Sequence, residues 1–275
     1  MNQDKTIFFI HGLWMTPRSW ELFRGFYEQR GYRTIAPAWP RMKGEVEELR
    51  RDPSALAGLG VTEIADHYEK LVRRLDEPPV LVGHSFGGLI VQILLDRGLG
   101  AAGISVDGVP PKGVLRLPFS AVKAASAVLR NPANYRRTVM LTYKQFRYGF
   151  ANVMSESDAR AAYERYAVPG PGRPIFQVAF ANLDPNSETT VDRRNSQRAP
   201  LLLIAGTEDH QVPPAMDREN LKRYEGSTAV IEYKEFPGRS HLIMAQAGWQ
   251  EVAEFALSWA EDKAGWSATA VAKSA

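Results

Sequence analysis

The sequence predicts an α/β fold, with a doubly wound, mostly parallel sheet of about six strands and helices on both faces. Two observations lead to this prediction. Short apolar runs alternate with amphipathic helical segments along most of the 275 residues, which is the pattern of repeated strand–helix units. The alternation stops at residue 110 and resumes at residue 200, so we expect a helical cap inserted after the fourth predicted strand.

The first ninety-odd residues provide half of the predicted sheet. Short apolar runs are typical of buried parallel strands, and Ser19 is a suitable N-cap for a helix that Gly31 would end. Residues 41–60 are polar and contain glycine, which indicates a loop or a weak helix. In order, this part predicts a strand at 6–10, a helix from Ser19 to about Gln29, a strand at 32–36, a helix starting at Thr62, a strand at 80–82 and a helix at 89–95.

The remaining strands lie on either side of the interruption. Residues 101–106 predict the fourth strand, whereas 110–199 contain aromatic helical pieces and no strand signal. Later segments predict a strand at 200–205, a helix at 216–224, a strand at 229–236 and a helix at 248–262. We therefore expect an α/β core made of residues 1–109 and 200–263, an inserted cap at 110–199, and a disordered tail at 264–275.

Composition excludes several classes of protein. No apolar run reaches the ~20 residues of a membrane-spanning helix, and the N-terminus has no signal-peptide core. The absence of cysteine excludes disulfides and fits a cytoplasmic protein. The five histidines have no metal-binding spacing, so we predict neither a metal nor another cofactor. The net charge of +3 is too small to indicate nucleic acid binding.

The motif around Ser85 is the strongest chemical signal. An apolar strand leads into Gly83-His84-Ser85-Phe86-Gly87, and an apolar helix follows. This G-x-S-x-G pattern between a strand and a helix is typical of a nucleophile elbow. Glycine is needed at positions 83 and 87 because side chains there would collide in so sharp a turn. The turn would place the Ser85 hydroxyl above the strand ends.

A serine nucleophile needs a base, and the base needs an acid that fixes its tautomer. His241 and Asp209 follow the last two predicted strands, and they give the chain order Ser, Asp, His that is typical of this elbow architecture. Asp107 also follows a strand and is the alternative acid; we favour Asp209 because Val212-Pro213 follows it. Glu208 is a lesser alternative, expected at the surface.

Four motifs together resemble the α/β-hydrolase family. His11-Gly12 resembles its oxyanion loop, the Ser85 motif its elbow, Gly206–Asp209 its acid loop and Gly238–His241 its histidine loop. The resemblance covers about residues 6–110 and 199–262; the first two strands usual in the family are missing, hence the expected six. It implies that Ser85 attacks an acyl carbonyl, with His241 as base and Asp209 as its orienting acid. It also implies an oxyanion hole formed by the backbone N–H groups of Leu13 and Phe86, with His11 and Gly12 supporting the loop.

The predicted cap supplies the candidate substrate-binding residues. Residues 108–155 contain eight Lys or Arg and no acid, so the rest of the chain has a net charge of −5. Such a stretch is usually a solvated face; as a hypothesis, Arg136, Arg137 and Arg147 bind an anionic substrate group. The aromatic residues at 135–154 either pack the cap on the core or line an apolar pocket. Trp14 could line the same pocket, and His84 lies beside the nucleophile.

These observations favour a serine hydrolase of the α/β-hydrolase type that cleaves small to medium carboxylic esters, with or without an anionic group, through an acyl-enzyme. The serine argues against relatives with an aspartate nucleophile. Two alternatives use the same residues: hydrolysis of thioesters or C–C bonds, and hydroxynitrile lyase chemistry. A third alternative, a non-catalytic ligand receptor, remains because a fold does not fix a function.

Overall fold

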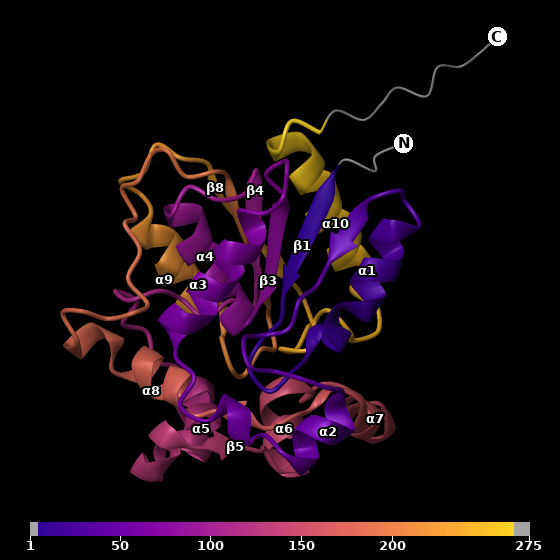
Figure 1. Ribbon diagram of the computed structural model, residues 1–275, viewed down its shortest axis with the longest axis vertical. Coiled ribbons are helices and arrows are strands. Elements are labelled where there is room, and N and C mark those ends of the chain that lie inside the picture. Colours follow the sequence, from indigo (N-terminus) through magenta and orange to yellow (C-terminus); the bar gives the residue numbers. More distant parts are fainter. Residues whose placement is uncertain (1–4, 267–275) are drawn as a thin grey trace.

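A computed structural model describes residues 5–266 and contains a six-stranded sheet in which every neighbouring pair is parallel. The predicted fold class is confirmed. The strands follow the order β2-β1-β3-β4-β7-β8 (Figure 1). Their bounds are β1 Thr6–Ile10, β2 Arg33–Ile35, β3 Val80–His84, β4 Ala102–Val106, β7 Leu201–Gly206 and β8 Ile231–Phe236.

Burial explains which apolar runs became central strands. Every residue of β1, β3, β4 and β7 is buried, because helices cover both faces of this part of the sheet. The outer strands β2 and β8 are largely half-buried or exposed. The loops with Gly12, Ser85, Asp107 and Asp209 follow these four central strands, and the loop with His241 follows β8.

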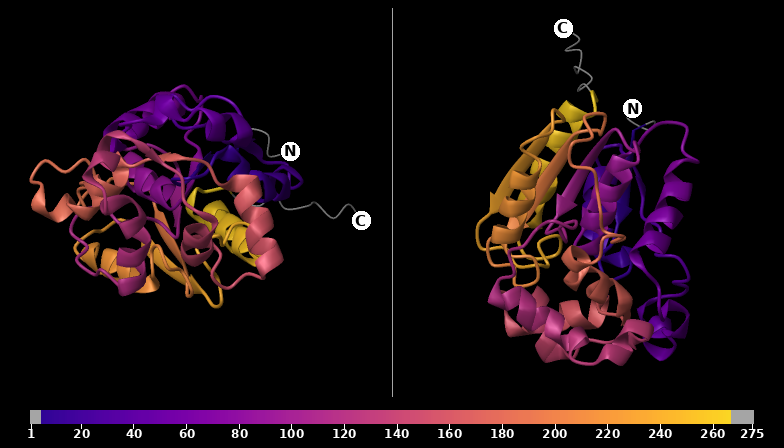
Figure 2. Two further views of the ribbon diagram at one scale, coloured as in Figure 1. Left: turned by 90° about the horizontal axis from the view of Figure 1, so that it is seen from below. Right: turned by 90° about the vertical axis from the view of Figure 1, so that its left-hand side faces the viewer.

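The helices form two layers around the sheet (Figures 1 and 2). On one face α1 contacts α10, and on the other α3 contacts α4, which also packs on β3 and β4. The bounds are α1 Glu21–Glu28, α2 Val46–Arg51, α3 Val61–Val72, α4 Phe86–Asp96, α9 Pro214–Arg223 and α10 Trp249–Lys263. The predicted start of the first helix was wrong. A 3₁₀ turn at Pro17–Trp20 precedes α1 with Thr16 as its cap, and the Ser19 hydroxyl donates to the Thr16 carbonyl.

The chain between β4 and β7, residues 107–200, is here called the inserted segment. It contains α5 Phe119–Leu129, α6 Tyr143–Phe150, α7 Glu156–Tyr166 and α8 Arg173–Ala179. These helices lie beyond the carboxyl ends of the strands (Figures 1 and 2). The expectation of no strand was wrong at one point, because β5 (Thr138–Val139) pairs antiparallel with β6 (Gly170–Pro171). Strands of two residues are too short to leave a periodic sequence signal.

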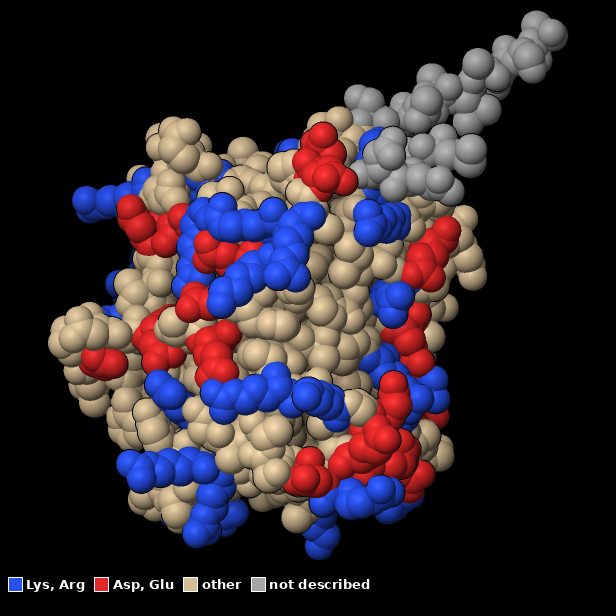
Figure 3. All heavy atoms as spheres, in the orientation of Figure 1, with Lys and Arg blue, Asp and Glu red and all other residues tan. Residues whose placement is uncertain are grey.

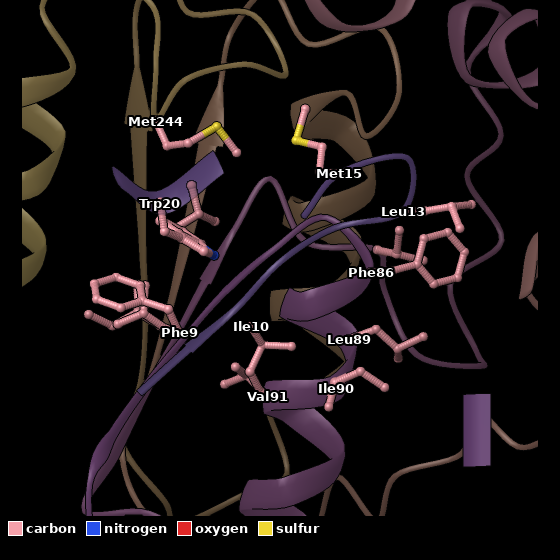
Figure 4. Close-up of a cluster of buried hydrophobic side chains, with 14 of the residues drawn as sticks. Phe9, Ile10, Leu13, Met15, Trp20, Phe86, Leu89, Ile90, Val91 and Met244 are labelled. Atoms are coloured by element: carbon pink, nitrogen blue, oxygen red, sulfur yellow. The ribbon is translucent and has the colours of Figure 1, made fainter. Parts of the chain in front are cut away.

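The core extends from the sheet up to the loop that follows β1. Figure 4 shows Phe9 and Ile10 of β1, Leu89 and Ile90 of α4, and Leu13 of this loop in one buried cluster. Because the loop is fixed by core packing, its backbone has little freedom beside the site.

At the C-terminal end, Trp266 stacks on Tyr32 with the ring centroids 5.8 Å apart. Of the tail predicted to be disordered, residues 267–275 lie outside the described residues. No helix within residues 5–266 combines the length and apolar character that crossing a bilayer requires.

Candidate active site

Ser85 occupies the sharp turn between β3 and α4. Its backbone has φ 56° and ψ −120°, a strained region for a residue with a side chain. The flanking glycines make this turn sterically possible. A Cβ at Gly83 would overlap the Gly87 carbonyl group, and one at Gly87 would overlap the Ile10 carbonyl oxygen. The elbow therefore depends on these two glycines for the reason expected from the sequence.

Asp209 and His241 contact each other near this turn, since His84, the residue before Ser85, bonds the His241 carbonyl. His241 Nδ1 lies 2.6 Å from Asp209 Oδ2, and both side chains are fully buried. Asp209 Oδ1 accepts hydrogen bonds from the backbone N–H groups of Gln211 (2.6 Å) and Val212 (3.0 Å). These donors orient the carboxylate toward His241. A proton on His241 Nδ1 that is donated to Asp209 leaves Nε2 with a lone pair. Nε2 is buried and has no hydrogen-bond partner within residues 5–266.

Asp107, the alternative acid, is close to this pair but is bonded elsewhere. Its Oδ1 accepts from the Gly206 N–H at 2.7 Å, and its Oδ2 is buried without a hydrogen-bond partner among the described residues. Burial, reinforced by the negative charge of Asp209, raises the pKa of Asp107 well above its usual value. The residue is also strained, with φ 45°. Glu208 is exposed, as expected.

The loop after β1 lies directly against the nucleophile. A Cβ at Gly12 would stand 2.9 Å from the Ser85 Cβ, so a larger residue would push the two apart. His11 holds the loop: its Nδ1 donates to the Gly12 carbonyl (3.0 Å), and its Nε2 accepts from the Trp39 N–H (3.2 Å). Burial lowers the pKa of His11 to about 4, so the ring is neutral near pH 7. The Leu13 and Phe86 side chains point in the same direction in Figure 4.

Residues of the inserted segment cover the site at the carboxyl ends of the strands. The Trp14 indole N–H donates to the Val139 carbonyl (3.0 Å), and the Val168 N–H donates to the Trp14 carbonyl (2.9 Å). Phe150 makes an edge contact with the His241 ring, with centroids 4.9 Å apart. As a result Ser85 is 6% exposed and His241 is completely buried.

Of the candidate substrate-binding residues, Trp14, His84 and Arg147 have other partners, whereas Arg136 and Arg137 are exposed. His84 is completely buried, and its Nε2 donates to the His241 carbonyl at 2.7 Å. Burial, followed by the neighbouring His241, lowers the pKa of His84, so this ring is a neutral support of the histidine loop. Arg147 forms an ion pair with Glu156 at 3.0 Å. Arg136 is exposed on the 3₁₀ turn Pro132–Arg136. Neither arginine contacts the proposed catalytic residues.

Sequence reasoning missed Phe150 at the histidine and the direct support of His241 by His84. An aromatic residue in a helix indicates packing but not its partner, so no sequence signal was available for Phe150.

One group of potential metal ligands occurs within residues 5–266. One atom from each of His84, Asp107 and His241 lies within 4.8 Å of the others. The hydrogen bonds of the two histidines use His84 Nε2 and His241 Nδ1, and the other ring nitrogen of each has no hydrogen-bond partner among the described residues. We assign no metal to this group.

Sequence comparison agrees with this architecture. The sequence profile described as "Alpha/beta hydrolase family" matches residues 7–255. The chain belongs to the alpha/beta hydrolase family. The fold and the family resemblance predicted from the motifs are both confirmed. No curated protein matches this family member in sequence.

Solved structures of other family members share the fold. An extracellular α/β-hydrolase from a Paenibacillus species is 20% identical, with 92% of this chain and 98% of that chain covered and a TM-score of 0.68. The monoacylglycerol lipase of Paleococcus ferrophilus is 20% identical, with 92% and 93% covered and a TM-score of 0.64. A methylesterase from Arabidopsis is 14% identical, with 94% and 99% covered and a TM-score of 0.66. At these identities the likeness concerns the fold.

Proposed function

We propose that the protein is a serine hydrolase that cleaves carboxylic esters through an acyl-enzyme. The observation that carries the proposal is the buried 2.6 Å contact between His241 Nδ1 and Asp209 Oδ2, next to a serine held in a strained elbow. A hydrogen-bonded acid and base beside a strained nucleophile are the parts that activate a serine hydroxyl. The names of two structural neighbours, a methylesterase and a monoacylglycerol lipase, also refer to enzymes that cleave esters.

The proposed reaction has two halves. His241 Nε2 takes the Ser85 proton as Oγ attacks the ester carbonyl, and the same proton then passes to the alcohol that leaves. Asp209 stabilises the imidazolium that forms between these transfers. Water, activated by His241, then attacks the acyl-enzyme and releases the acid. The N–H groups of Leu13 and Phe86 would stabilise the oxyanion in both halves.

We propose further that the substrate is a small to medium ester with an uncharged acyl group. The side chains beside Ser85 and His241 are apolar: Leu13, Trp14, Phe86 and Phe150 are all buried. The anionic substrate expected as one option has less support, because Arg147 is paired with Glu156 and Arg136 faces outward. In this proposal the inserted segment acts as the cap that closes over the acyl group.

Hydrolysis of p-nitrophenyl acetate, butyrate and octanoate tests the assignment. Replacing the nucleophile in Ser85→Ala should lower kcat by at least about 10⁴-fold, and Asp209→Asn by about the same factor, because His241 would lose its orientation. Asp107→Asn should retain most of the activity, because Asp107 bonds the Gly206 N–H and not His241. Glu208→Gln, an exposed neighbour of Asp209, is the control.

The outcomes separate the proposal from its alternatives. If Asp107→Asn were as inactive as Asp209→Asn, the assignment of the acid would be wrong. If the wild type cleaved no ester but Ser85 still reacted with a fluorophosphonate, thioester, C–C bond and cyanohydrin substrates would be tested next. Tight ligand binding without turnover would instead indicate a receptor.

A further inference from the structure

The inserted segment carries an unusual amount of exposed apolar surface. Ten large hydrophobic side chains are exposed within residues 5–266, and six of them lie on two short stretches of this segment. Phe119 and Leu183 are the most exposed of them, at 80% and 81%. The six residues, here called the apolar patch, are Leu115, Leu117, Phe119, Val122, Phe180 and Leu183.

The two stretches of the apolar patch lie side by side. The Gly113 N–H donates to Asn182 Oδ1 (2.7 Å), and Asn182 Nδ2 donates back to the Val114 carbonyl (2.8 Å). Lys112 Nζ also donates to the Asp184 carbonyl at 2.6 Å. In addition, α5 contacts α8 directly. The patch is therefore one surface, although its residues come from positions 115–122 and 180–183.

Helix α5 places positive charge next to this apolar surface. Ala121 and Val128 form its buried side, so Phe119, Lys123 and Arg130 project from the opposite side by the helical period. Lys123 Nζ lies over the Tyr148 ring, and Arg130 Nε donates only to a backbone carbonyl. Arg116 stands between two patch leucines.

The side chains of these cations form no ion pair with a carboxylate of the described residues. Of the eight Lys and Arg side chains between residues 108 and 155, Arg147 alone forms an ion pair with a carboxylate of the described chain. In Figure 3 the lower left of the molecule, where Figure 1 places α5, shows Lys and Arg without Asp or Glu. Two acidic residues adjoin the patch. Glu219 accepts the backbone N–H groups of Leu115 (3.1 Å) and Arg116 (2.8 Å) and pairs with Arg223, and Asp184 Oδ1 accepts the Asn186 N–H.

We propose that the apolar patch and its cations dock on the surface of an anionic lipid bilayer. Exposed Leu and Phe side chains gain by entering the boundary between headgroups and acyl chains, while Lys and Arg gain from the anionic headgroups. A second copy of the chain fits less well, because a two-fold interface would bring the same unpaired cations together. Nucleic acid would use the cations but not the protruding Leu and Phe side chains.

Docking in this way would hold the inserted segment against the lipid. The segment lies beyond the carboxyl ends of the strands, where Ser85 and His241 lie, so the site would open close to the bilayer surface. The proposal does not depend on the esterase function, because it concerns binding rather than turnover.

Co-sedimentation of the full chain with lipid vesicles tests the proposal. We expect the wild type to bind vesicles of equimolar phosphatidylcholine and phosphatidylglycerol, to bind pure phosphatidylcholine weakly, and to be released from the mixture by added salt. Arg116→Gln with Arg130→Gln should weaken binding by about 25-fold, at about fivefold for each charge. Leu117→Ser with Phe119→Ser should weaken it by at least as much.

Matched controls keep the result specific. Val230→Ser and Arg74→Gln change exposed residues outside the inserted segment and should bind as the wild type does. Ser85→Ala should also bind normally, which separates lipid binding from catalysis. Thermal melting of each variant shows whether it is folded.

Three results would overturn the proposal. The first is a wild type that does not sediment with the anionic vesicles at low salt. The second is an apolar variant that binds normally, because the attraction would then be electrostatic adsorption alone. The third is a wild type that is dimeric in solution and becomes monomeric in the apolar variant, which would make the patch an interface between copies of the chain.

Discussion

The surroundings of Asp107 change its pKa and, through it, the stability of the folded protein. It ends β4 fully buried, with one oxygen bonded to the Gly206 N–H and the other without a hydrogen-bond partner in the described chain. Because burial and the charge of Asp209 raise the pKa of Asp107, the folded protein releases this proton at a higher pH than the unfolded chain does. Stability therefore falls as the pH rises above the unfolded pKa of about 3.9.

Asp107→Asn should remove this penalty. The amide can still accept the Gly206 N–H and does not ionise, so we expect a melting temperature a few degrees higher at pH 7. The gain should shrink as the pH falls through about 4 and should be lost below it, where the wild-type carboxyl is protonated in the unfolded chain as well. Calorimetric melting of both proteins across this pH range measures the effect.

Asp107→Ala is the comparison for this experiment. It loses the bond to Gly206 and should be less stable than the wild type at every pH. If the Asn variant were destabilised at pH 7 as much as the Ala variant, Asp107 would have to be an ionised partner of the histidines.

At the scale of elements, one buried ion pair fixes the end of the inserted segment. Asp96, the last residue of α4, accepts hydrogen bonds from the Asp192 N–H (2.8 Å) and from Asn195 Nδ2 (3.0 Å). Arg198 Nη2 bonds the same carboxylate at 3.0 Å, and its side chain is fully buried. These contacts hold the residues that precede β7 against α4, the helix that follows Ser85.

Arg198→Met should therefore lower the free energy of unfolding by about 3 kcal/mol, because it leaves the half-buried Asp96 carboxylate without its main partner. Urea unfolding measures the change. The neighbouring Arg194 is exposed, so Arg194→Met should stay within about 0.5 kcal/mol of the wild type. Equal effects of the two substitutions would mean that the buried pair contributes no net stability.

At the scale of the molecule, access to Ser85 depends on how the inserted segment is held. Arg50 of α2 donates to three carbonyl groups at the end of α7, those of Tyr163, Glu164 and Ala167, at 2.8–3.0 Å. Glu21 of α1 accepts bonds from Arg165 and Tyr166. Because Ser85 is almost completely buried, we expect a large reagent to reach it more readily when such contacts open.

Arg50→Met should weaken this closure. We expect Ser85 to react with a bulky fluorophosphonate about tenfold faster, while its rate with a small one changes little, because charged hydrogen bonds contribute about 1.5–3 kcal/mol to the closed state. The neighbouring Arg51 is exposed, and Arg51→Met serves as the control. Rates that change equally for both reagents would show that Arg50 acts on the site itself and not on access.

The sequence by itself determined the series of strands, the turn at Ser85 and the family. These features are local. An apolar run indicates a buried strand, and glycine at positions 83 and 87 indicates a turn too tight for side chains at those two positions. Such local features do not depend on where the segment lies in the fold, because residues that are neighbours in the sequence are always close together. The motifs around them also sufficed to expect the six-stranded parallel sheet.

Only the tertiary structure decided which side chains meet. Asp107 and Asp209 both follow central strands, and their sequences do not show that Asp209 bonds His241 while Asp107 bonds a backbone N–H. His84 supports the carbonyl of a residue 157 positions away, and Arg147 pairs within the inserted segment. Such contacts depend on the direction that each side chain takes after its loop. That direction is set by the packing of distant segments, which a local pattern does not contain.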